Sequence, residues 1–108
     1  NGNADGAFVY TGFKPAFVIV KLWAAAYDGQ WTMHDNKRAN SFNSSTGGTL
    51  YPHIANAEAT GLGRNIHFFS NGFKFTGSDE GNTAGEHVYI AFAEAPFVNS
   101  NGVPCNAR

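Results

Sequence analysis

The sequence predicts an all-β domain, an antiparallel two-sheet sandwich or jelly roll of about six to eight strands with little helix. Aromatic residues make up 15% of the chain and ten of them are Phe, which favours strands over helices. Thirteen glycines and numerous asparagines predict frequent tight turns, because both residues tolerate positive φ. Short apolar or alternating runs recur between these turns. A barrel is the alternative architecture.

Length and charge narrow the class of protein. A chain of 108 residues fits one domain. Charged residues make up 14%, against roughly 25% in ordinary domains, so neutral polar residues supply much of the surface. The net charge of −1 gives no electrostatic reason to expect nucleic acid, and no apolar run approaches the roughly 20 residues of a membrane span. We expect one sandwich domain over residues 1–108, with a connector at 1–7 and a tail at 98–108, as a fragment of a longer protein.

The first half of the chain contains the most apolar segment. The expected elements are strands at 8–11, 16–23 and 30–35, a polar loop at 36–49, a short extended piece at 50–54 and a weak helical turn at 55–60. Residues 16–23 are apolar on both faces apart from Lys21, which predicts a central strand covered on both sides. The next strand places Trp31 and Met33 on one face and Thr32 and His34 on the other, and we expect Trp31 in the core.

The second half contains the clearest local signal, Asn71-Gly72 between the alternating runs 65–70 and 73–76. This dipeptide predicts a hairpin with a type I′ turn, in which Phe68 lies opposite Phe75. One face of the hairpin would hold Ile66, Phe68, Phe73 and Phe75, and the other His67, Phe69, Lys74 and Thr76. After a second polar loop at 77–85, a last strand at 86–95 has Val88, Ile90 and Phe92 on one face and His87, Tyr89, Ala91 and Ala93 on the other.

The sequence shows no arrangement typical of catalysis, and we expect no enzyme. No Gly-x-Ser-x-Gly elbow occurs. The carboxylates that could serve glycoside cleavage are Asp79, Glu80, Glu86 and Glu94, and the last is expected to be buried and paired with backbone or with a basic residue. Four widely spaced histidines, His34, His53, His67 and His87, fit no zinc pattern and are expected on strand surfaces.

Neither cofactor nor disulfide is expected. The loop at 79–82 offers oxygen ligands but lacks the spacing of a recognised calcium loop, so we expect no bound calcium. Cys105 is the single cysteine and therefore forms no internal disulfide. It is interpreted as a stray thiol in a tail, with an intermolecular disulfide between copies as the alternative.

The loops have a composition suited to binding. Glycan recognition needs an aromatic platform beside amide, hydroxyl and carboxylate groups, usually on loops at one end of a scaffold. The candidate ligand-binding residues are Trp23, Tyr27, Asp28, Asn36, Lys37, Arg38, Tyr51 and His53.

Several blocks of sequence, in the right order, resemble a domain common in phage tail-fibre and tail-tip proteins. The blocks span residues 10–21, 31–38, 50–52 with 56–58, 66–74, and 82–85 followed by 88–97. The resemblance covers most of residues 6–97 and implies a concanavalin-like β-sandwich, a virion location in a tail fibre or tail tip, and a homotrimer. No catalytic or ligand-binding residue of that family transfers to this chain.

The expected function is attachment to the host surface by receptor binding, through recognition of a glycan, with a glycan or a protein receptor and other copies of the chain, in a homotrimer, as partners. Two alternatives to this first function stay open. The second is a structural or decorating virion module that oligomerises or stacks without direct receptor contact. The third is a cellular carbohydrate-binding module. None of them involves nucleic acid or insertion into a membrane.

Overall fold

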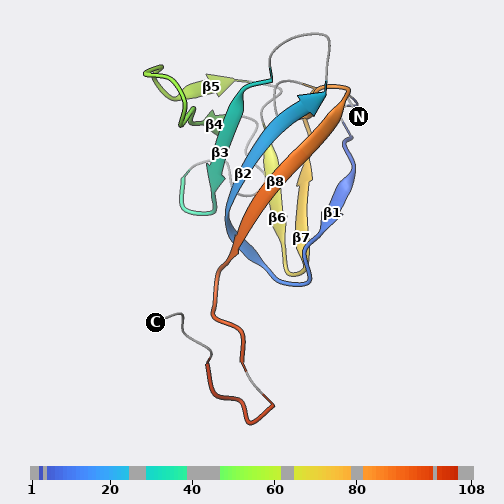
Figure 1. Cartoon of the computed structure of the whole chain (residues 1–108), viewed down its shortest axis with the longest axis vertical. Coiled ribbons are helices and arrows are strands. Elements are labelled where there is room, and N and C mark those ends of the chain that lie inside the picture. Colours follow the sequence, from blue (N-terminus) through green and yellow to red (C-terminus); the bar gives the residue numbers. More distant parts are fainter. Residues whose placement is uncertain are drawn as a thin grey trace.

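The computed structural model describes residue 3 and residues 5–24, 29–38, 47–61, 65–78, 82–98 and 100–104. In this part of the chain the strands form three antiparallel sheets, ordered β1-β7-β6, β3-β2-β8 and β4-β5 (Figure 1). The strands are β1 (Phe8–Tyr10), β2 (Pro15–Ala24), β3 (Trp31–Asp35), β4 (Gly47–Thr49), β5 (Ala59–Gly61), β6 (Ile66–Phe69), β7 (Gly72–Phe75) and β8 (Glu86–Ala93). The two three-stranded sheets face each other, so the predicted all-β sandwich is confirmed.

The core lies between these two sheets. Strand β2 contributes Val18 and Val20, and the β6–β7 hairpin contributes four large apolar side chains that meet them. The buried cluster consists of Val18, Val20, Ile66, Phe68, Phe73 and Phe75. Phe73 and Phe75 pack edge to face with ring centroids 5.9 Å apart, a geometry that aromatic pairs prefer. The predicted inner face of the hairpin is therefore confirmed.

Strand β2 is central in its sheet, as the sequence predicts. It pairs with β3 on one side and β8 on the other, with irregular register near both ends of its pairing with β8. Its inward side chains Val18, Val20 and Leu22 are buried. The side chains on its other face are only partly buried in the single chain. The prediction that both faces of this strand are covered is therefore confirmed for the inner face only.

Strand β3 has the opposite orientation to the one expected for Trp31. Thr32 and His34 point inward and are 1% and 2% exposed, whereas Trp31 and Met33 lie on the outer side of the sheet. The inner position suits His34 because its ring packs edge to face on Phe75, with centroids 5.5 Å apart. Placing Trp31 in the core and His34 on the surface was therefore wrong.

The β6–β7 hairpin forms, but its predicted register is wrong. Phe68 lies opposite Phe73, and Phe69 lies opposite Gly72, so the turn residues are Ser70 and Asn71. Gly72 belongs to the strand, where β1 passes so close that a Cβ atom would collide with the carbonyl oxygen of Val9. Glycine is needed here for close approach of two backbones rather than for a type I′ turn.

The middle of the chain contains more strand than expected. Strand β4 lies at the end of the predicted loop 36–49, and β5 begins inside the predicted helical turn 55–60. These two short strands pair with each other, and Leu50 bridges to Met33 beside them. Backbone pairing therefore prevails over the weak helical preference of the alanines near residue 57.

Gly72→Ala is expected to destabilise the domain by about 1–3 kcal/mol, because the added methyl group overpacks the contact between β7 and β1. Urea unfolding at equilibrium measures the change. Ser70→Ala in the adjoining exposed turn is the control, with an expected change within about 0.5 kcal/mol. Equal stabilities of the Gly72→Ala variant and the wild type would contradict the close approach.

Stability is also expected to depend on the protonation of His34. Burial, with a smaller effect of the Arg38 charge, lowers the pKa of His34 to about 4, against the opposing effect of Asp35. Between pH 6.5 and 4 the unfolded chain binds the proton and the folded chain does not, so the free energy of unfolding falls as the pH falls, by up to about 3 kcal/mol. Both ring nitrogens of His34 lack a hydrogen-bond partner among the described residues, which fits a neutral ring.

Replacing this ring tests the assignment. His34→Leu is expected to flatten the loss of stability between pH 6.5 and 4, as measured by urea unfolding at several pH values. His53→Leu, at an exposed histidine, is expected to leave that loss unchanged. An unaltered pH dependence in the His34→Leu variant would contradict a buried neutral His34.

Candidate functional site

Among the described residues, the largest group of exposed apolar side chains belongs to the outer side of the β3-β2-β8 sheet. Side chains directly opposite each other on neighbouring strands share a face, so the register identifies the members of this surface. Ile19 lies between Met33 and Ile90, and Lys21 lies between Trp31 and Val88. This surface, called the outer face below, consists of Phe17, Ile19, Lys21, Trp23, Trp31, Met33, Asp35, Val88, Ile90 and Phe92.

The outer face is open to solvent along strand β8. Val88, Ile90 and Phe92 are 45%, 51% and 54% exposed. Three strands about 4.8 Å apart and about eight residues long cover roughly 350 Å² in projection. The largest apolar patch on a typical monomer covers about 300–600 Å² and is often functional. The outer face falls within this range, and its composition suits a contact surface.

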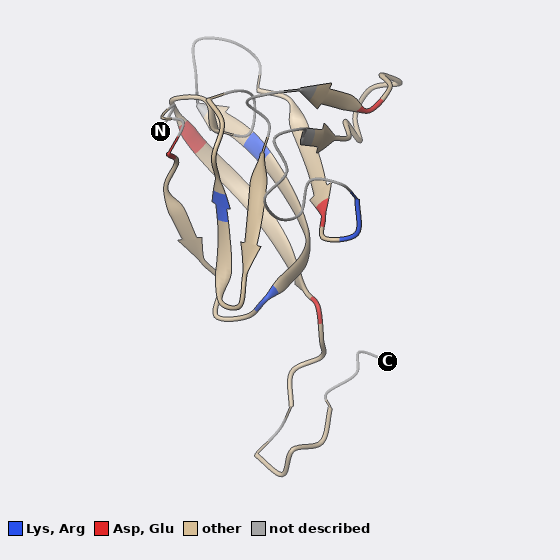
Figure 2. Ribbon diagram, turned by 180° about the vertical axis from the view of Figure 1, so that it is seen from behind, with Lys and Arg blue, Asp and Glu red and all other residues tan. Residues whose placement is uncertain are grey.

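Charge is sparse on this surface. Figure 2 shows that the acidic and basic residues of the described chain lie mainly at strand ends and in loops. Within the outer face only Lys21 and Asp35 are charged. The Nζ atom of Lys21 lies 5.2 Å from the centre of the Trp31 ring, a cation–π distance, so its charge rests against an aromatic surface.

Trp23 stands at one end of the outer face and is 70% exposed. The register of β2 against β8 shifts between Leu22 and Ala24, so Trp23 occupies a bulge. Bulges redirect a side chain at the edge of a sheet, which explains why so large an aromatic ring projects into solvent.

A charged cluster closes the opposite end of the sheet. Glu94 forms an ion pair with Lys14 at 2.5 Å between Nζ and Oε2, and Asn36 donates a hydrogen bond of 3.1 Å to its other oxygen. The hydrogen bond from Lys14 lowers the pKa of Glu94, against slight desolvation. Glu94 is paired, as predicted, but it is exposed rather than buried.

Asp35 organises the loop that follows β3. Its Oδ1 atom accepts hydrogen bonds from the backbone nitrogens of Lys37 and Arg38 at 2.8 and 2.9 Å, and its other oxygen pairs with the Arg38 guanidinium. Arg38 also reaches Glu58, with 3.2 Å between Nη1 and Oε1. Partial burial raises the pKa of Asp35, but the hydrogen bond from Arg38 and the two backbone donors outweigh it, so the pKa is lowered overall.

The structure does not bring the candidate ligand-binding residues together. Asn36 follows β3 and bonds to Ala16, whereas Trp23 lies at the far end of β2, seven residues or roughly 23 Å along the strand. The polar groups of Asn36 and Arg38 hold the loop in place rather than pointing at a common ligand. Of residues 36–38, only Lys37 is exposed.

The remaining described candidates are Tyr51 and His53. Tyr51 is 8% exposed and packs edge to face on the exposed His53, with ring centroids 6.4 Å apart. Its ring is therefore part of the packing under the 51–54 turn and is not a platform for a ligand. Tyr27 and Asp28 lie outside the described residues.

The sequence indicates the outer face in part, because residues 16–23 are apolar on both faces apart from Lys21 and are therefore expected to need cover on both sides. The alternation in 86–95 groups Val88, Ile90 and Phe92 correctly, but it does not say which face is the core. The sequence signal for this surface is that residues 16–23 and 86–95 carry apolar side chains on both faces of their strands. The interior of one sandwich covers only one face of each strand, so the other apolar face stays exposed.

The outer side of the other sheet also exposes aromatic rings, but polar contacts interrupt it. Phe8 and Phe69 are 46% and 37% exposed and pack edge to face with centroids 5.7 Å apart. His67 and Thr76 share a hydrogen bond of 2.8 Å, and Lys74 pairs with Asp5 at 2.5 Å. The outer face differs from this side in its continuous aliphatic centre.

The described residues offer neither a metal site nor a membrane-spanning helix. Among them, no group of three or more His, Cys, Asp or Glu side chains is placed to hold a metal ion. Within the same ranges, the structure contains no helix with the length and apolar character needed to cross a membrane.

Comparison with known families gives one match. Residues 1–96 match a family model described as a domain of unknown function, DUF7483. The chain belongs to this family. The match includes every described strand and the whole outer face, and it ends at Pro96, just after β8. No curated protein and no solved structure matches the chain. The family description names no function, so the resemblance to phage tail-fibre domains stays a prediction.

Removing the Arg38 guanidinium is expected to raise the pKa of Asp35. The hydrogen bond and the charge of Arg38 both lower this pKa, and burial, which opposes them, remains in the variant. The titration of the Asp35 carboxyl carbon in NMR spectra of Arg38→Gln measures the change. Lys37→Gln is the control, because Lys37 contributes only its backbone N–H to Asp35. An unshifted titration in Arg38→Gln would show that the ion pair does not form in solution.

Proposed function

We propose that this domain is a structural module of a phage tail fibre or tail tip that assembles into a homotrimer through the outer face. The observation that supports the proposal is the contiguous apolar surface over β3, β2 and β8, whose β8 side chains Val88, Ile90 and Phe92 are about half exposed. The virion location and the trimer follow from the resemblance to tail-fibre domains. The contact surface follows from the geometry.

The chemistry of the outer face favours protein over sugar as its partner. Its centre is aliphatic, with Ile19 flanked by Met33 and Ile90. A glycan needs hydrogen-bonding groups beside its aromatic platform, because its hydroxyl groups must exchange their bonds to water for bonds to protein. The core of a protein interface is instead depleted of charge and enriched in aromatic residues and Met, which describes the outer face.

Burial of this surface supplies the driving force. Complete burial of a Val, Ile or Phe side chain contributes about 1.5–3 kcal/mol, so covering the exposed half of each β8 side chain adds about 1 kcal/mol. Each subunit offers several such side chains, whose sum opposes the entropy lost on association.

Host attachment through a glycan is the alternative function, and it stays a prediction. The observation in its favour is Trp23, an exposed aromatic ring at one end of the sheet. Against it, Trp23 lies roughly 23 Å from the polar loop at 36–38 that was expected to complete the site. The structural role therefore has the better support.

Ile90→Asp is expected to weaken self-association at least 100-fold, because assembly would bury an unpaired carboxylate in an apolar contact. Light scattering over a range of protein concentrations, with reductant present to exclude a Cys105 disulfide, measures the oligomeric state. The wild type is expected to be a trimer and the Ile90→Asp variant a monomer with unchanged secondary structure by circular dichroism.

Ile54→Asp is the matched control. Ile54 has the same side chain and is 39% exposed, but it lies in the 51–54 turn and outside the outer face. This variant is expected to remain trimeric. A wild-type chain that stays monomeric at all concentrations, or an equal effect of both substitutions, would overturn the proposal.

A further inference from the structure

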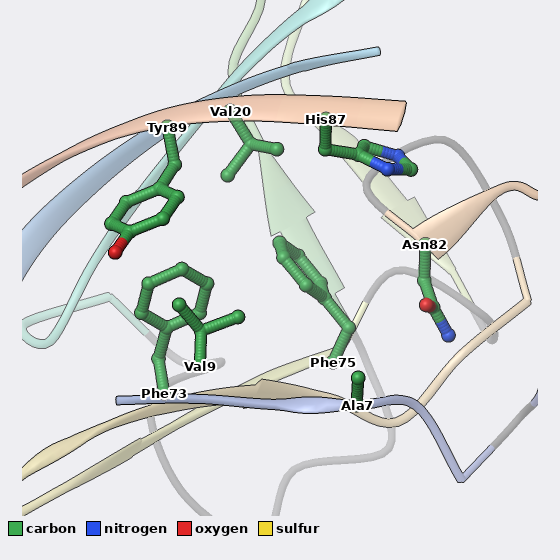
Figure 3. Close-up of a pocket in the computed structure, with 8 residues that line it drawn as sticks. All are labelled: Ala7, Val9, Val20, Phe73, Phe75, Asn82, His87 and Tyr89. Carbon is green, nitrogen blue, oxygen red and sulfur yellow. The ribbon is translucent and has the colours of Figure 1, made fainter. Parts of the chain in front are cut away.

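A pocket opens at one side of the sandwich, between the two sheets. Strands β8 and β1 are end strands, and among the described strands none pairs with the second edge of β8. The pocket at this side has a volume of about 100 Å³. Figure 3 shows Tyr89 and Phe73 at one end of it and His87 and Asn82 at the other. The two ends differ in their chemistry.

The first end is a part of the core that stays accessible. Tyr89 lies opposite Val20 on the inner side of the β3-β2-β8 sheet, and yet it is 44% exposed. Its ring packs edge to face on Phe73 with centroids 5.3 Å apart, and Phe73 packs in the same way on Phe75. Val9 and Val20 complete the wall. Three aromatic rings in this arrangement favour a further ring beside them, because edge-to-face contact is a geometry that aromatic pairs prefer.

The volume of the pocket suits one six-membered ring. A dry cavity of about 150 Å³ holds benzene. A pocket of about 100 Å³ that opens to solvent beside Tyr89 therefore holds most of such a ring and leaves a small part of it at the mouth. Tyr89 and His87 both point to the inner side of the sheet, two residues or roughly 7 Å apart along β8, so a single substituted ring reaches both ends.

The second end presents a hydrogen-bond acceptor without a donor. The Nδ1 atom of His87 lies 3.2 Å from the carbonyl oxygen of Gly85, and since a carbonyl only accepts, Nδ1 holds the hydrogen. Burial lowers the pKa of His87, against the opposing effect of this hydrogen bond, so the ring is neutral at pH 7. The Nε2 atom is then an acceptor, and it is buried without a partner among the described residues. A donor would stabilise this atom, so this end favours an occupant with an O–H or N–H group.

Asn82 does not supply that donor. Its amide nitrogen donates to the carbonyl oxygens of Asn3 and Gly77, at 2.5 and 2.6 Å, which holds the side chain as a fixed wall. Among the described residues that line the pocket, none is Lys, Arg, Asp or Glu. An ion placed there would lose hydration without gaining an opposite charge, so the pocket disfavours charged ligands.

We propose that this pocket binds a free, compact and neutral aromatic molecule that carries one O–H or N–H donor, the class to which phenol belongs. The ring would lie against Phe73 and Tyr89, and the donor would bond to Nε2 of His87. The site lies on the inner sides of the sheets and shares no residue with the outer face. The inference therefore goes beyond the proposed assembly and does not depend on it.

The experiment titrates the full chain with phenol, and NMR signals of the His87 and Tyr89 rings measure binding. Phenol is expected to shift both sets of signals saturably and to move the Nε2 resonance of His87, which reports the new hydrogen bond. Anisole has the same ring, but a methyl group replaces its hydroxyl hydrogen, and it is expected to bind at least about tenfold more weakly. Benzoate, a charged analogue, is expected to leave both sets of signals unchanged at the same concentration.

His87→Phe removes the acceptor and keeps an aromatic ring at this position. The variant is expected to bind phenol and anisole equally, so that the preference of the wild type is lost. His53→Phe, at an exposed histidine outside the pocket, is the control and is expected to retain the preference. The comparison of phenol with anisole in the wild type needs no substitution, so it tests the inference even where His87→Phe does not fold.

Three results would overturn the inference. The first is the absence of a saturable shift of the His87 signals at millimolar phenol, and the second is equal affinity of the wild type for phenol and anisole. The third is tighter binding of N-acetyltyrosinamide than of phenol, since the pocket would then accept a side chain of a partner protein. Repeating the titration with the Ile90→Asp variant separates the pocket from the outer face, because unchanged phenol binding there supports the pocket whether or not the outer face drives assembly.

Discussion

Packing between β2 and the β6–β7 hairpin is the contact on which the fold depends. Val18 and Val20 meet the rings of the hairpin, and this single apolar layer joins the two sheets. Because side chains alternate along a strand, fixing these two residues inward fixes Ile19 and Lys21 outward. Residues of β3 and β8 that lie opposite each β2 residue point to the same side, so the whole sheet has one inward and one outward face. The outer face is thus a direct consequence of how the core is built.

The sequence predicted which residues share a face better than which face is buried. For β8 and the hairpin, alternation grouped the residues correctly. For β3, size and hydrophobicity favoured Trp31 in the core, but the space beside Phe75 is filled by the smaller His34. The hairpin register failed for a related reason, since Gly72 is required by a neighbouring strand that no local pattern reveals. Tertiary neighbours decide such positions.

The dispersal of the predicted binding residues has a simple topological cause. The last residues of β2, with Trp23, and the first residue of β3, Trp31, lie at one end of the sheet, whereas Asp35 ends β3 at the other end, next to Asn36. Connections between successive antiparallel strands alternate between the two ends of the sheet. Two connections therefore share an end only when two strands lie between them. This much follows from the strand prediction alone. The ion pairs of Arg38 and Glu94, by contrast, depend on loop paths that the sequence does not specify.

Lys21 limits how the outer face can be covered. Its ammonium group lies among apolar side chains, where water and the Trp31 ring are the groups that stabilise its charge. A flat stack of one sheet directly on another would strip this cation of solvent, so it disfavours indefinite pairing of newly made chains. A tilted arrangement leaves a channel for the ammonium group. In the proposed assembly, the same residue would therefore act as a gatekeeper against aggregation and would constrain the angle between subunits.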